Sequence, residues 1–147
     1  MKKKLLFVLT RSPFPSVDGT RERIFRELKI IARESDLNIL IITDEKINKE
    51  QKNVLTNLID NKVKIFKLNK IKCLMNSLIS IPFKVPMQSY YFFNKKALKW
   101  LKLNSNNYDT IFFHTIRFGE YIKNIKQNNK NKVKLLLGFN DAISMNY

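Results

Sequence analysis

Short apolar runs alternate with longer amphipathic stretches along this chain. Five runs predict β-strands, at Leu5–Thr10, Leu37–Thr43, Val63–Leu68, Ile111–His114 and Val133–Leu137. The first two have no polar alternation, which is typical of strands buried on both faces of a parallel sheet. The third alternates apolar residues with lysine, so we place it nearer the edge of the sheet.

Helices are predicted between these strands, over Thr20–Arg33, Lys49–Ile59, Ile71–Ile81, Gln88–Leu103 and Phe118–Lys126. The first carries an apolar stripe on one side, and Gly19 stands where its N-cap would fall. Strands that alternate with helices imply right-handed crossovers and a parallel sheet. We therefore predict an α/β fold: one Rossmann-like domain over residues 1–147, with a doubly wound parallel sheet of about five strands flanked by helices.

The charge balance is strongly basic, with 28 Lys and Arg against 12 Asp and Glu and a formal net charge of +16. An excess of positive charge of this size is typical of proteins that bind nucleic acid, an anionic membrane surface or negatively charged small molecules. A Lys- and Asn-rich composition, as an AT-rich coding sequence produces, is the alternative explanation. The lone Cys73 excludes an internal disulfide and favours a reduced, cytoplasmic compartment.

The loop after the first predicted strand is punctuated by prolines and ends in Asp-Gly before the first helix. Ligands of open α/β sheets bind at the carboxyl ends of strands, and free amides in a first helical turn attract phosphate. Gly19, Thr20 and Arg23 are therefore candidate phosphate-site residues. A plain turn glycine beside a solvated arginine is the alternative, and the dinucleotide fingerprint is absent.

His114 is the only histidine, and it ends the fourth predicted strand, where the first and fourth strands would diverge. There it could hydrogen-bond a sugar or phosphate, or transfer a proton. Arg117 either joins it or is a solvated loop charge. Asp141 and Ser144 follow the fifth strand, where Asp141 either accepts hydrogen bonds from hydroxyls or caps a helix. Cys73 and His114 cannot form a metal site alone, so we predict no metal.

Several stretches, taken in order, resemble one known family: Leu5–Leu9 followed by Pro13, Pro15 and Gly19; Arg23 with Leu28; Val85–Gln88 with Tyr90–Phe93; Tyr108–His114; and Asn140–Tyr147. The chain resembles the N-terminal domain of a GT-B glycosyltransferase. Within that fold it is similar to the retaining family called group 1 or family 4, of the bacterial polysaccharide sugar transferase type.

The resemblance implies a hexosyltransferase in the full-length protein, with a nucleotide-sugar donor as substrate and no further cofactor. It places Gly19, Thr20 and Arg23 near the donor diphosphate and His114, as the catalytic residue, near the transferred sugar. Arg117, Asp141 and Ser144 would then lie on the acceptor side. The acceptor would be a saccharide or a lipid-linked molecule.

A lipid-linked acceptor would give the Lys-rich surface and the aromatic segment Gln88–Phe93 a membrane-facing use. The protein would then be cytoplasmic, with peripheral contact at the anionic inner face of the cytoplasmic membrane. Burial in the core is the alternative for the aromatic segment, and the one we favour.

The family's second, donor-binding domain has no counterpart in this sequence, so we expect the chain to be inactive alone. Two other classes remain open: a standalone nucleotide-binding module and a basic nucleic-acid-binding module. Lysines are spread through every segment and no nucleic-acid motif is present, so nucleic acid is the less favoured partner.

Overall fold

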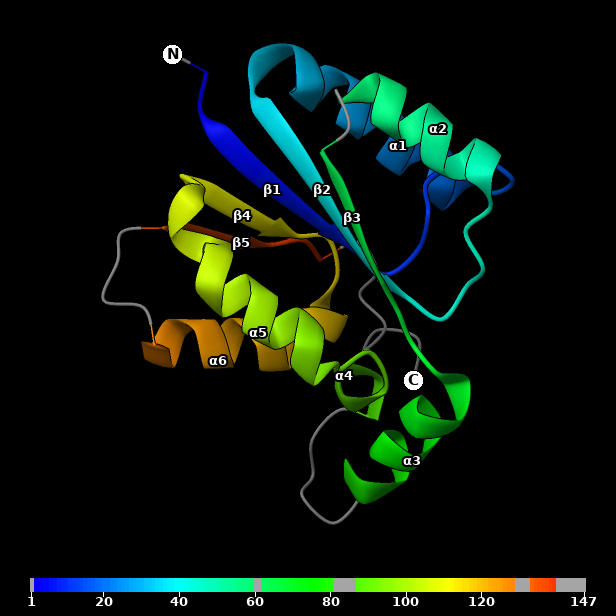
Figure 1. Ribbon diagram of the computed structural model, residues 1–147, viewed down its shortest axis with the longest axis vertical. Helices are drawn as coiled ribbons and strands as arrows, with labels where there is room; N and C mark the ends of the chain where they lie inside the picture. Colours follow the sequence, from blue (N-terminus) through cyan, green and yellow to red (C-terminus); the bar gives the residue numbers. More distant parts are fainter. Residues whose placement is uncertain (1, 60–61, 81–86, 129–132, 140–147) are drawn as a thin grey trace.

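The computed structural model describes residues 2–59, 62–80, 87–128 and 133–139. Its centre is an all-parallel sheet of five strands in the order β3-β2-β1-β4-β5 (Figure 1). The strands are β1 Lys4–Leu9, β2 Asp36–Thr43, β3 Val63–Lys67, β4 Thr110–Phe113 and β5 Lys134–Leu137. This confirms the predicted α/β class, the doubly wound parallel sheet and the edge position of the third strand.

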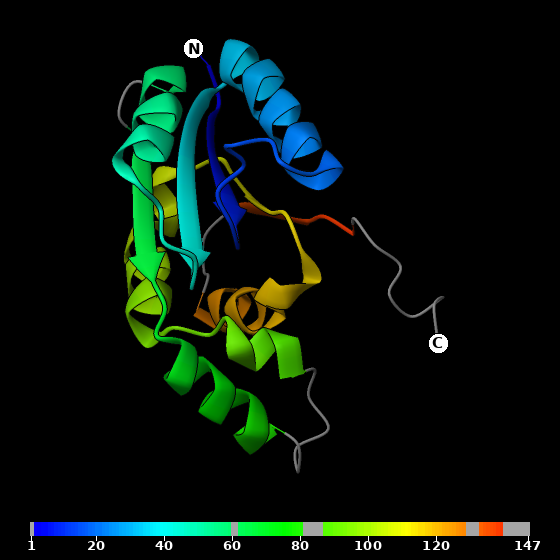
Figure 2. The same cartoon turned by 90° about the vertical axis from the view of Figure 1, so that its right-hand side faces the viewer.

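Helices cover both faces of this sheet. They are α1 Gly19–Glu34, α2 Lys49–Leu58, α3 Lys70–Ser80, α4 Met87–Tyr91, α5 Lys95–Asn104 and α6 Gly119–Asn128, with short 3-10 turns η2 Ser105–Asn107 and η3 Ile116–Phe118. In Figures 1 and 2, α1 and α2 lie over one face, and α5 and α6 lie over the other. The remaining pair, α3 and α4, lies beyond the edge at which the strands end.

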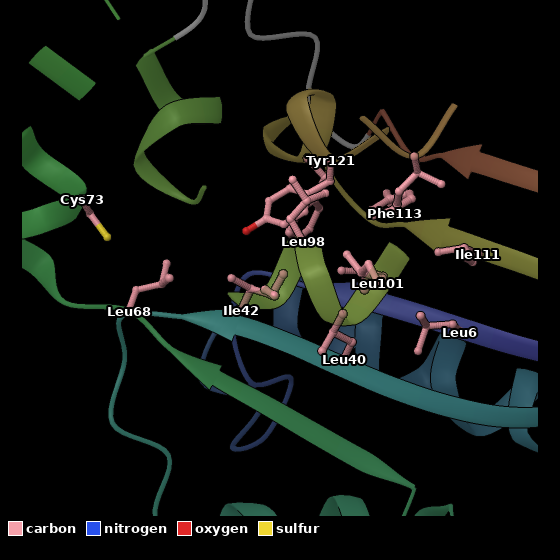
Figure 3. Close-up of a cluster of buried hydrophobic side chains, with 14 residues drawn as sticks. Leu6, Leu40, Ile42, Leu68, Cys73, Leu98, Leu101, Ile111, Phe113 and Tyr121 are labelled. Atoms are coloured by element: carbon pink, nitrogen blue, oxygen red, sulfur yellow. The ribbon is translucent and has the colours of Figure 1, made fainter. Parts of the chain in front are cut away.

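β1 and β2 have unbroken apolar runs because each of them supplies two cores. Leu6 and Val8 of β1 face the α5–α6 layer, while Phe7 and Leu9 face α1 and α2. Successive side chains of a strand point to opposite faces, so burial on both sides needs an apolar residue at every position. Figure 3 shows the α5–α6 side of the sheet.

The crossovers create a switch point between β1 and β4. β1 pairs in parallel with β2 along one edge and with β4 along the other. The chain leaves β1 for α1 on one face and leaves β4 for α6 on the opposite face (Figure 2). The two connections diverge at the carboxyl ends of these strands, which is where open α/β sheets bind ligands.

Two predicted helix boundaries are wrong, and side-chain capping explains both. Asp18, not Gly19, is the N-cap of α1: its carboxylate accepts the amide of Arg21 at 2.8 Å, and Gly19 is the first helical residue. The single helix predicted over Gln88–Leu103 is divided into α4 and α5. Asn94 caps α5 by accepting two backbone amides at 2.9 and 3.0 Å. Asp and Asn are both preferred at N-caps, because their side-chain oxygens accept hydrogen bonds from the free backbone amides of the first helical turn.

A buried hydroxyl joins α6 to the segment between α4 and α5. The Tyr121 side chain is fully buried, and its Oη donates to the carbonyl of Phe92 at 2.9 Å and accepts the amide of Asn94 at 2.7 Å. Burial raises the pKa of Tyr121. The tyrosine thus satisfies two backbone groups in the break between the helices.

Replacing this tyrosine should destabilise the fold through those two groups. Tyr121→Phe keeps the ring packing but leaves a donor and an acceptor unpaired, so we expect a loss of about 1–3 kcal/mol in the free energy of unfolding. Urea denaturation measures it. Tyr90→Phe is the matched control, since its hydroxyl forms no hydrogen bond with the described residues. An equal loss in both variants would contradict this role of the Tyr121 hydroxyl.

Candidate functional site

The switch point brings the end of β4 against the first half of α1. His114 follows β4 directly, and its amide donates to the carbonyl of Val8 on β1 at 3.1 Å. Its side chain is only 7% exposed and packs against the rings of Phe7 and Phe112, at centroid separations of 5.7 and 6.3 Å. The imidazole is therefore held in one orientation, toward α1.

Glu27 of α1 faces this imidazole. Its Oε2 lies 3.8 Å from Nε2 of His114, and its Oε1 lies 3.6 Å from Nε of Arg23. Both separations exceed an ordinary hydrogen bond. Arg23 and Glu27 form an ion pair, and His114 and Glu27 form one when the imidazole is protonated. The structure thus brings two predicted site residues, His114 and Arg23, to the same carboxylate.

Sequence reasoning missed Glu27. One signal was available, because Glu27 lies four residues after Arg23 and the two can pair on a helix surface. Nothing in the local sequence places it opposite His114, which lies 87 positions further along the chain. That contact depends on how α1 packs over β1 and β4.

The backbone at Gly19 is open. An added Cβ would meet no neighbouring atom within 4 Å, and the residue does not have a positive φ. The fold therefore does not require glycine here, unlike at Gly138, where a Cβ would lie 3.0 Å from the carbonyl oxygen of His114. Gly19 and the exposed Thr20 leave room for a ligand beside the first turn of α1.

Asp18 already places a negative charge at this helix terminus. Its hydrogen bond from the Arg21 amide, together with the charges of Arg21 and Arg11, lowers the pKa of the carboxyl group. The Arg21 guanidinium is shared between Asp18, at 3.2 Å, and Glu45, at 2.9 Å. A bound phosphate would therefore lie beside Gly19 and Arg23, since the cap itself is occupied.

The remaining predicted site residues have other surroundings. Arg117 is partly buried: its Nε donates to Oε1 of Gln88 at 3.1 Å, and its guanidinium lies 5.2 Å from the ring centre of Phe92. It contacts α4 rather than standing as a free loop charge. Asp141 and Ser144 lie outside the described residues.

The structure was also searched for metal-binding groups and for helices that could cross a membrane. Among residues 2–59, 62–80, 87–128 and 133–139, no group of three or more His, Cys, Asp or Glu side chains could hold a metal ion. Over the same ranges, no helix combines the length and apolar character needed to cross a bilayer.

Fold and switch point together define a Rossmann-like α/β domain with a candidate ligand edge at β1 and β4. Scans against protein-family models find no match, and a search of curated proteins finds none either. Among solved structures, the chain is similar to the C-terminal domain of a hydrogenase from Pyrococcus furiosus. The two share 16% sequence identity over 93% of each chain, with a TM-score of 0.53. At that identity the likeness shows the fold alone.

Alanine substitutions at Gly19 and Gly138 should change the free energy of unfolding in opposite directions. Gly19→Ala should raise the free energy of unfolding by about 0.4–1 kcal/mol, because alanine restricts the unfolded chain and fits the folded one. Gly138→Ala should lower it by about 1–3 kcal/mol, because the added carbon would press on the His114 carbonyl and the Phe112 ring. Urea denaturation compares them. A comparable loss in both would show that Gly19 is needed by the fold.

Proposed function

We propose that this chain is the N-terminal, acceptor-side domain of a glycosyltransferase. The enzyme would move a sugar from a nucleotide-sugar donor to a cell-surface polysaccharide or a lipid-linked acceptor. The observation that carries the proposal is the placement of His114 and Arg23 on either side of one carboxylate, Glu27, at the switch point. The order of motifs that resembles the GT-B family supplies the reaction class.

In this proposal the donor loses its sugar at the bond between the anomeric carbon and the diphosphate oxygen. A new bond forms from that carbon to an acceptor hydroxyl, and the proton of that hydroxyl passes to the departing diphosphate oxygen. The Nε2 edge of His114 faces Glu27 and can hydrogen-bond a sugar hydroxyl near the reacting carbon. Arg23 can offset charge on the departing diphosphate, and the open backbone at Gly19 lets that group approach.

The second, donor-binding domain of such an enzyme would supply most nucleotide contacts. Residues 1–147 alone should then bind nucleotide sugars weakly. Their contribution would be one wall of the cleft, namely His114, the first turn of α1 and the acceptor surface.

Sugar transfer by the complete reading frame that contains these residues tests the proposal. We expect release of nucleoside diphosphate from one sugar donor in a UDP- and GDP-sugar panel, given a lipid-linked acceptor extract. His114→Ala should lower kcat by about 100-fold or more if the imidazole acts at the reacting centre. Gly19→Val should raise the KM for the donor.

Two controls separate chemistry from folding. Gly19→Val adds a Cβ that meets no neighbouring atom within 4 Å, so its unfolding free energy should be no lower than that of the unaltered protein. Ile30→Gln changes an exposed residue of α1, 63% accessible, and should leave transfer unchanged. Absence of transfer from every donor, or full transfer by His114→Ala, would contradict the proposal.

A standalone nucleotide binder is the second candidate, favoured by the open backbone at Gly19 within this domain alone. Calorimetry of residues 1–147 with UDP, GDP and their sugars separates the two. Tight binding by this chain without a second domain would favour the standalone binder, whereas weak binding is expected of one half of a cleft.

A further inference from the structure

The α3 helix exposes its apolar side. Ile71, Leu74, Met75, Leu78 and Ile79 are each between 55% and 73% exposed, and they recur at the spacing of one helical face. The side turned toward the domain carries small residues instead: Cys73 is 2% exposed and Ser77 is 4% exposed. We call the five exposed residues the apolar face of α3. A contiguous patch of this kind marks an interaction site.

The helix is held in this orientation by contacts on its small-residue side. Cys73 belongs to the buried core, and Ser77 Oγ donates to the Cys73 carbonyl at 3.0 Å and lies 3.4 Å from the carbonyl oxygen of Met87 on α4. The neighbouring α4 is tied to the end of β2 by a hydrogen bond of 2.8 Å from the Tyr91 hydroxyl to Asp44. That hydrogen bond raises the pKa of Tyr91 to about 12.

Lysines flank this face. On α3, which carries no aspartate or glutamate, Lys70 and Lys72 are exposed. At about 100° per residue they fall on the two flanks of the apolar face. An apolar stripe between lysines is the pattern of a helix that lies in the surface of an anionic membrane.

The position of α3 fits that use. Figures 1 and 2 both show α3 beyond the carboxyl edge of the sheet, away from α1 and α2. His114 and the start of α1 lie at the same edge. The aromatic segment that sequence reasoning considered as a membrane surface is different, because Tyr91, Phe92 and Phe93 pack against the core.

We propose that α3 docks the protein onto an anionic lipid bilayer. The apolar face enters the interface, and Lys70 and Lys72 contact lipid headgroups. A lipid-linked acceptor would then meet the protein at the edge that holds His114. The meeting with a lipid-linked acceptor rests on the proposed glycosyl transfer. The docking of α3 on the bilayer does not.

Other occupants fit the surface less well. A second copy would bring Lys70 and Lys72 of each α3 together, and α3 itself carries no acidic side chain to pair with them. A nucleic acid would contact the lysines but gain little from aliphatic side chains, since strand binders use exposed aromatic rings for stacking.

Vesicle flotation tests the docking surface on this chain. We expect binding to vesicles of equal parts phosphatidylcholine and phosphatidylglycerol, and little to phosphatidylcholine alone. Leu74→Gln with Leu78→Gln should weaken partitioning about tenfold or more, and Lys70→Gln with Lys72→Gln should do likewise. Added salt should weaken binding by the unaltered protein.

Matched controls use equally exposed residues elsewhere. Ile30→Gln with Leu103→Gln, at sites 63% and 70% exposed, should bind vesicles like the unaltered protein. Lys49→Gln with Lys52→Gln on α2 should do so too. All altered positions are exposed, and circular dichroism checks that each variant folds.

Three results would overturn the inference: no binding to anionic vesicles, equal losses in the control variants, or unchanged binding in both α3 variants. A dimer in gel filtration that the α3 variants abolish, without vesicle binding, would assign the face to a second copy. Sugar transfer to a detergent-dispersed acceptor reports on the proposed function separately, so either idea can fail alone.

Discussion

Burial of β1 on both faces and pairing along both edges is the constraint on which the rest of the structure depends. The strand lies between β2 and β4, and its side chains supply both cores. The connections that leave the neighbouring strands β1 and β4 run to opposite faces of the sheet, to α1 on one and to α6 on the other. The gap between their starting points is the candidate ligand edge, and His114 directly follows β4 beside it. The candidate site is therefore a direct consequence of strand order.

Several charged side chains at this edge are already paired with one another. Asp18 caps α1, and Arg21 is held between Asp18 and Glu45. These groups stabilise the loop and leave Arg23 and Glu27 facing the His114 side. The candidate site is therefore a histidine, a carboxylate and a guanidinium in a row, beside an open stretch of backbone at Gly19. Such a row can hydrogen-bond hydroxyls and offset phosphate charge.

Much of the fold could be predicted because unbroken apolar runs at Leu5–Thr10 and Leu37–Thr43 admit few interpretations other than buried parallel strands. The break before α5 was missed because the apolar run Tyr90–Phe93 continues through it, and only Asn94 signals a new helix. Glu27 was missed because its contact with His114 joins segments far apart in sequence. For α3, periodicity predicts an apolar side but not which side the domain covers. Tertiary packing decides that, and here it covers the small residues.

Amide chemical-shift mapping of isotope-labelled residues 1–147, during titration with UDP- and GDP-sugars, tests directly whether a ligand binds at the β1–β4 switch point. Even weak binding moves the amides that surround a ligand. We expect the shifts to gather at the carboxyl edge, on Gly19, Thr20, His114 and Gly138. Shifts gathered instead at the opposite edge, around Lys62 and Tyr108, or scattered over the exposed lysines, would contradict a ligand site at the β1–β4 switch point.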